Sequence, residues 1–367
     1  MRNRVIGIVI VLIAVFGAIG LKVYLDSRSV AGPKGITGVI APKTTVVLKG
    51  YVGGEKVGLL DDPEVQQILA EKYGIRLDYT KAGSFEMVDL ADKTTDFLFP
   101  SSQTAAEYLR DKETLKPRSI ETVLSSPIVV YSWTDIAEAL TKQGIVAKVN
   151  GTYYVIDMPS FVKAMEAGKS WADLGVPSLY GKAKVISTDP NKSNSGNQFA
   201  GLLANVMAGD VVTPDTVGTV VPRLKALFAR LGYMDSSSGD LFSEYLRLGE
   251  GADPMVAGYE NQVVEFAAAN PSQWTGAKSR IAILYPEPTV WSEHQVVVLT
   301  EKAAPLITAM KDPDIQRIAW ERHGFRAGAA GASATAPKGI LGIPPTVNKV
   351  VAMPQYTVMR TIMNGVR

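Results

Sequence analysis

The fold is decided by residues 44–80, which read TTVVLKGYVGGEKVGLLDDPEVQQILAEKYGIRLDYT. Residues 44–48 are mostly β-branched and predict a strand. A capping side chain at Asp62, followed by a proline, predicts a helix over residues 63–73. A second strand is expected at residues 75–80. The folded part of the chain therefore starts as strand, helix, strand, the unit from which parallel sheets are built.

The same alternation continues further along the chain. Helices are expected at residues 84–91 and 104–110, with a strand at residues 96–99 between them. Strands that alternate with helices predict a mainly parallel sheet covered by helices on both faces.

Two long apolar runs, at residues 126–133 and 290–299, flank a different set of strands and helices. Each run is long enough to leave one sheet and enter another. We therefore predict an α/β fold of two Rossmann-like lobes joined by a two-crossing hinge. The expected division is lobe 1 at residues 44–130 and 290–326, lobe 2 at 131–289, a linker at 27–43, and a linker with a C-terminal arm at 327–367.

Composition excludes several functional classes. The 367 residues carry a formal net charge of +2, so no excess of positive charge points to nucleic acid. The chain has no cysteine, which excludes disulfides and thiolate metal sites, and its two histidines exclude a multi-histidine centre. Motifs for serine hydrolases, nucleotide-binding loops and zinc proteases are absent from the sequence. We expect no cofactor, no metal and no enzymatic activity, and we expect His294 to lie in solvent.

The N-terminus predicts export. Arg2 and Arg4 precede an uncharged stretch of 17 residues at 5–21, which as a helix measures about 26 Å, near the lower limit for a bilayer core of roughly 30 Å. Residues 1–26 are therefore expected to be a single membrane anchor, and the alternative is a cleaved secretory signal. In both cases the positive-inside rule places everything after Asp26 outside the cytoplasm.

Polar turns follow several of the expected strands, at the edge where open α/β sheets bind ligands. In lobe 1 these are the glycine-rich loop at residues 49–58 and the turns that contain Ser84 and Ser101. In lobe 2 the turn at residues 193–196 leads into a helix, whose first N–H groups could hold an oxyanion or a carboxylate. Each turn alone can also be read as an ordinary helix cap.

Three further residues are candidates at the lobe boundary. Tyr259 and Glu260 open a helix after a strand, and Glu260 either favours the helix dipole or reaches a ligand amine or hydroxyl. Tyr285 lies beside the second crossing, where it either covers a ligand or packs the hinge. The complete candidate set is Gly53, Gly54, Ser84, Ser101, Ser102, Ser193, Asn194, Ser195, Gly196, Tyr259, Glu260 and Tyr285.

Four stretches carry a resemblance to a known superfamily. They are STDPNKSNSG at residues 187–196, DPMVAGYENQ at 253–262, ILYPEPT at 283–289 and QRIAWERHGFR at 316–326. The chain resembles the type 2 periplasmic solute-binding proteins, which include the molybdate-, sulfate- and phosphate-binding proteins of ABC transporters. The resemblance implies two α/β lobes that close on a small molecule, and an ABC transporter permease as partner.

These observations together predict an extracytoplasmic solute-binding protein. It would capture a small polar or anionic ligand between its lobes for ABC-type uptake, and the alternative is a membrane-anchored sensor or scaffold that uses the same fold without transport. If the hinge prediction holds, the turns at residues 50–54, Ser84 and Ser101 face Ser195 and Glu260 across one cleft.

Overall fold

The computed structural model describes residues 45–112, 115–328, 336–337 and 339–367. The predicted anchor or signal at residues 1–26 and the predicted linker at 27–43 lie outside the described residues. None of the helices in the described part has both the length and the apolar character needed to cross a membrane.

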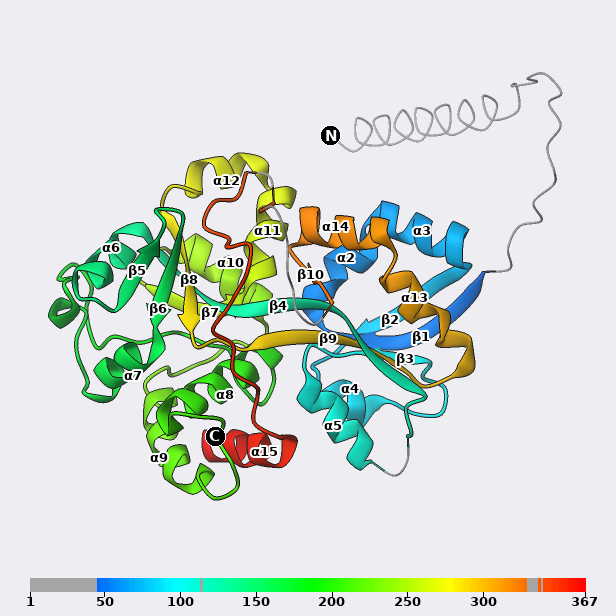
Figure 1. Cartoon of the computed structure of the whole chain (residues 1–367), viewed down its shortest axis with the longest axis horizontal. Helices are drawn as coiled ribbons and strands as arrows, with labels where there is room; N and C mark the ends of the chain where they lie inside the picture. Colours follow the sequence, from blue (N-terminus) through cyan, green and yellow to red (C-terminus); the bar gives the residue numbers. More distant parts are fainter. Residues whose placement is uncertain (1–44, 113–114, 329–335, 338) are drawn as a thin grey trace, which may run out of the picture. The chain divides into compact units, whose positions relative to one another are not determined.

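The first lobe contains a sheet with helices on both faces (Figure 1). Strand β1 (Val46–Val52) pairs in parallel with β2 (Ile75–Lys81) and β3 (Phe97–Phe99), whereas β9 (Trp291–Val298) runs antiparallel to β3. The helices of this lobe are η1 (Gly54–Lys56), α2 (Val57–Asp61), α3 (Pro63–Tyr73), α4 (Glu86–Leu90), α5 (Gln103–Asp111), η3 (Glu301–Ala303), α13 (Pro305–Met310) and α14 (Pro313–His323). Separate apolar clusters fill the two sides of the sheet.

Local signals explain why these elements form where they do. The Asp62 carboxylate accepts a hydrogen bond from the backbone N–H of Glu64 at 2.9 Å, and Pro63 occupies the first turn of α3. Gly74 ends the same helix in the left-handed region at φ 66°, where a glycine has no steric cost. The prediction of a helix over residues 63–73 is confirmed.

The second lobe has a mixed sheet rather than a mainly parallel one. Strand β4 (Ser119–Trp133) runs antiparallel to β7 (Met255–Tyr259) and β8 (Ile281–Glu287), and β6 (Tyr153–Asp157) runs parallel to β8. The remaining elements are α6 (Thr134–Lys142), β5 (Val146–Val149), α7 (Met158–Glu166), η2 (Ala172–Leu174), α8 (Asn194–Ala208), α9 (Val217–Phe228), α10 (Ser238–Leu248), α11 (Glu260–Ala269) and α12 (Pro271–Ala277). The sequence pattern also predicts a strand at residues 183–188, ahead of the polar turn before α8; this prediction is wrong, because the segment makes a single isolated bridge, from Ile186 to Val256.

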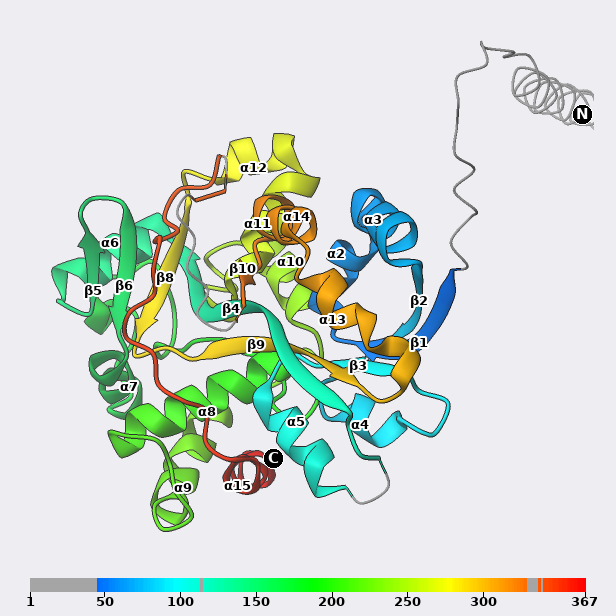
Figure 2. The ribbon, with the colours of Figure 1, turned by 45° about the vertical axis from the view of Figure 1, so that its right-hand side comes forward.

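Two neighbouring segments pass between the sheets. The first part of β4 pairs with β9 in the first lobe, and its last part pairs with β7 and β8 in the second. The connection from β8 to β9 lies beside it, because the Thr289 hydroxyl donates to the Ile128 carbonyl at 2.7 Å. The Ile128 N–H donates in turn to the Val290 carbonyl at 3.0 Å. The fold is therefore a mixed α/β fold with two lobes, whose sheets are connected by two adjacent crossings, and the C-terminal arm adds a third connection between the lobes (Figures 1 and 2).

The C-terminal arm packs on this framework. After the short strand β10 (Arg326–Ala327), which pairs with β4, the arm returns to the second lobe and ends in α15 (Tyr356–Gly365). Buried side chains of α15, among them Met359 and Ile362, join the apolar core of the second lobe. The Tyr356 ring stacks on Tyr108 of α5 at 4.8 Å between ring centroids, so the arm also touches the first lobe.

Candidate functional site

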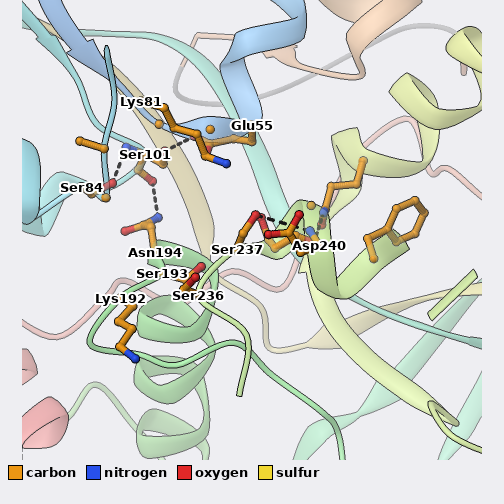
Figure 3. Close-up of a pocket in the computed structure, with 18 of the residues that line it drawn as sticks. Glu55, Lys81, Ser84, Ser101, Lys192, Ser193, Asn194, Ser236, Ser237 and Asp240 are labelled. Carbon is orange, nitrogen blue, oxygen red and sulfur yellow. Dashed lines mark hydrogen bonds between the residues drawn. The ribbon is translucent and has the colours of Figure 1, made fainter. Parts of the chain in front are cut away.

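A cleft of about 910 Å³ is lined by residues from both lobes. The first lobe contributes the turns that follow β1, β2 and β3, and the second lobe contributes the turn before α8 and parts of α10 and α11. Figure 3 shows the two sets of polar side chains on opposite sides of the cleft. Six of the residues predicted from the sequence line it: Gly53, Gly54, Ser84, Ser101, Ser193 and Asn194.

The other predicted residues of the α8 turn lie behind the cleft wall. The Ser195 hydroxyl is buried and lies 2.9 Å from the Thr188 hydroxyl and 3.1 Å from that of Ser193. At Gly196 a Cβ atom would lie 2.2 Å from the Thr188 carbonyl oxygen, so this position requires a glycine for close backbone approach. Ser195 and Gly196 thus hold the turn in place and do not line the cleft. Ser102 on the first lobe is also buried and does not line the cleft.

Asn194 joins the two lobes at the bottom of the cleft. Its side-chain N–H₂ group donates to the Ser101 carbonyl of the first lobe at 3.0 Å (Figure 3). The same group donates to the Tyr259 hydroxyl at 3.0 Å. Its amide oxygen is buried and has no hydrogen-bond partner among the described residues. Tyr259 does not line the cleft, because its ring is buried behind Asn194.

The floor of the cleft on the first lobe is a buried charged cluster that the sequence analysis missed. Lys56 in η1 is fully buried, and its ammonium donates to the Glu55 carboxylate, to the Ser101 hydroxyl at 2.8 Å and to His294 Nδ1 at 3.2 Å. The Ser101 hydroxyl also donates to Glu55. Within this cluster Glu55 and Ser101 line the cleft, whereas Lys56 and His294 lie beneath them.

Protonation states in this cluster follow from burial and from the neighbouring charges. Burial and the nearby Lys56 ammonium lower the pKa of His294 to about 4, so the ring is neutral at pH 7. Burial is the largest influence on Glu55 and acts to raise its pKa, but the Lys56 charge and the contacts with His294 and Lys56 together outweigh it and hold the pKa well below its usual range. The prediction that His294 lies in solvent is wrong, because β9 carries this side chain into the first lobe.

Glu260 and Tyr285 do not line the cleft either. Arg326 donates through Nε to one Glu260 oxygen at 2.6 Å and through Nη2 to the other at 2.7 Å. The Tyr285 hydroxyl adds a third hydrogen bond at 2.5 Å. Because three strong donors already occupy this fully buried carboxylate, its role in the described structure is to connect α11 with β10.

Other cleft residues could have been anticipated only in part. Glu55 lies in the glycine-rich loop that the sequence singled out, and Lys192 directly precedes the predicted turn at residues 193–196. Asp240 and Glu265, on α10 and α11, also line the cleft, and no motif marks them. No group of three or more potential metal ligands is found among the described residues.

Comparisons with known proteins agree with this architecture. No curated protein matches the chain. Among solved structures, the ferric binding protein from Campylobacter jejuni is similar with a TM-score of 0.56 and 12% identity, covering 87% of this chain and 97% of that one. An ABC transporter structure from Clostridium perfringens is similar with a TM-score of 0.55 and 12% identity, covering 86% of this chain and 96% of that one. The substrate binding protein of an ABC transporter from Agrobacterium tumefaciens is similar with a TM-score of 0.54 and 13% identity, covering 90% of this chain and 96% of that one.

At these identities the solved structures show the fold alone. A family model of bacterial extracellular solute-binding proteins, however, matches residues 48–326, which is most of the chain. The match covers both lobes and ends before the C-terminal arm. The resemblance drawn from the sequence is confirmed, and the chain belongs to the bacterial extracellular solute-binding proteins.

Proposed function

We propose that this protein captures a small polar solute in the cleft between its lobes and presents it to an ABC-type permease outside the cytoplasm. The observation that carries the proposal is the cleft itself, whose floor is built from hydrogen-bonding groups of both lobes. Family membership supports solute binding. The similar ABC transporter structures support the kind of partner.

Movement of the lobes would follow from the two crossings. We propose that residues 44–130 with 290–326 form one moving unit and that residues 131–289 form the other. Two adjacent strands allow bending about one axis, and a solute that touches both units stabilises the closed state through its higher affinity for it. If residues 1–26 are an anchor, they would hold the protein at the outer face of the membrane. If they are a signal, they would direct its export from the cytoplasm.

Polar residues that line both walls would bind the solute. Ser84, Ser101 and the backbone at Gly53 and Gly54 serve on the first lobe, and Ser193 and Asn194 serve on the second. The cleft is also lined by more carboxylates than ammonium groups. We therefore propose a polar solute rather than a free oxyanion, since like charges repel.

Native mass spectrometry of the full-length chain, purified from its own cells, tests the proposal. We expect a bound solute of defined mass. A Ser193→Phe variant should lose this solute, because Ser193 lines the wall and a phenylalanine ring there fills the cleft. Its side chain makes no capping hydrogen bond to α8, so the fold should persist.

A matched control is Ser160→Phe, which makes the same change at an exposed position on α7. The control should keep the solute. If the wild-type chain carries no solute, or if Ser193→Phe retains it as fully as Ser160→Phe does, capture in this cleft is contradicted.

A further inference from the structure

The strongest hydrogen-bond donors on the floor of the cleft are already in use. An ammonium group has three N–H bonds, and those of Lys56 point to three acceptors: Glu55, Ser101 and His294. The Ser101 hydroxyl has one proton, which it gives to Glu55. Both N–H bonds of the Asn194 amide are directed at the Ser101 carbonyl and the Tyr259 hydroxyl. None of these groups has a proton left for a solute.

Acceptors on the same floor are left over. The buried amide oxygen of Asn194 has no partner among the described residues. Its orientation is fixed, because a flipped amide would bring this oxygen against the Ser101 carbonyl oxygen, and two acceptors cannot bond. A buried polar atom without a hydrogen bond is costly, so a solute that donates to it gains affinity.

Glu55 supplies the second acceptor. Its side chain is 9% exposed, and the hydrogen bonds from Lys56 and Ser101 all go to Oε1. Its Oε2 atom has no hydrogen-bond partner within the described part of the chain and belongs to a residue that lines the cleft. The carboxylate is ionised, because Lys56 and His294 together outweigh the effect of burial and hold the pKa of Glu55 well below its usual range. An ionised acceptor forms its strongest hydrogen bonds with a charged donor.

Carboxylates outnumber ammonium groups around the cleft. Four carboxylates line it, from Glu55, Glu86, Asp240 and Glu265, against the two ammonium groups of Lys81 and Lys192. Both lysines are exposed, as are Glu86 and Asp240, so water and salt screen these four charges. The charge of Glu55 at the floor is screened less, because its side chain is only 9% exposed.

We infer that the solute is a small organic cation, which places an ammonium or guanidinium group between Glu55 and Asn194. This inference rests on the proposed function and names its substrate class. The volume of the cleft, about 910 Å³, suits an organic molecule rather than a single ion. Selection follows from the floor itself: an anion meets leftover acceptors that have no proton to give it, and a neutral polyol forms weaker hydrogen bonds there than a cation does.

Isothermal titration of the full-length protein tests this inference with four probes: agmatine, L-arginine, sulfate and mannitol. We expect heat of binding with agmatine or arginine and none with sulfate or mannitol. Glu55→Gln should weaken cation binding by about tenfold or more, the usual consequence of losing a hydrogen bond to a charged group.

Two further variants keep the test valid if Glu55→Gln folds poorly. Asp240→Asn alters an exposed carboxylate on the opposite wall and should weaken cation binding by about threefold through the loss of one nearby charge. Glu138→Gln makes a comparable change at an exposed position of α6 outside the cleft and should leave the affinity unchanged.

Each other outcome overturns the inference. If sulfate or mannitol binds while both cations fail, the cationic class is wrong, and the proposed capture of a polar solute in the cleft survives. If all four probes fail, the inference also falls. The proposed function falls with it only if native mass spectrometry of the wild-type chain detects no bound solute.

Discussion

Glu55 and Glu260 are both buried carboxylates paired with a buried cation, but only Glu55 lines the cleft. Arg326 donates hydrogen bonds to Glu260 through two nitrogens, and the Tyr285 hydroxyl is a third donor. Lys56 reaches Glu55 at Oε1 alone. The geometry of the partner therefore separates the two carboxylates: a forked guanidinium with a hydroxyl saturates a carboxylate, whereas a single ammonium leaves one oxygen available to a ligand.

The largest expected effect is the loss of the saturated pair. Arg326→Ala leaves Glu260 buried without its cation, and it also removes the donor to the Pro344 and Pro345 carbonyls of the C-terminal arm. We expect the free energy of unfolding to fall by about 3–5 kcal/mol. Urea denaturation measures this change.

Arg317→Ala is the control for this prediction, because Arg317 forms ion pairs on the exposed side of α14. It should cost no more than about 1 kcal/mol. Equal losses for the two variants would mean that Glu260 and Arg326 are not a structural pair.

A second prediction concerns the protonation of the cluster beneath the cleft. Burial and Lys56 lower the pKa of His294 from 6.5 to about 4. The unfolded chain therefore binds more protons between these values, and stability is lost as the pH falls through this window. Unfolding at pH 5 should require about 2 kcal/mol less than at pH 7 on account of this group.

The same urea titrations on a His294→Gln variant isolate this contribution. The difference in stability between pH 7 and pH 5 should shrink by about 2 kcal/mol in the variant, because glutamine does not titrate. An unchanged difference would show that His294 is not held neutral beneath Glu55.

A smaller effect is expected at Tyr285, which the sequence placed among the ligand-binding candidates. Tyr285→Phe removes one of the three donors to Glu260 and leaves the ring in place. We expect a loss of about 1.5 kcal/mol in stability, with no change in solute affinity. A fall in affinity without a fall in stability would return Tyr285 to the binding site and weaken the distinction between the two carboxylates.

Sequence reasoning succeeded where the signal is local. The cap at Asp62 and the polar turn that starts at Ser193 are set by neighbours in the chain, and both were predicted. The environment of Glu55 depends on His294, which follows Lys56 by 238 residues. That of Glu260 depends on Arg326, 66 residues later. No local pattern shows which of two glutamates will pair with an arginine and which with a lysine, so the sequence names Glu260 as a candidate and does not name Glu55.

A crystal structure of the protein with the solute that co-purifies with it would show which of the two carboxylates binds the solute. We expect the solute in the cleft, with a protonated nitrogen about 3 Å from Glu55 Oε2 and from the Asn194 amide oxygen. Glu260 should remain bound to Arg326 in the same crystal. A solute bound to Glu260, or bound outside the cleft, would show that Glu55 is not the carboxylate that receives it.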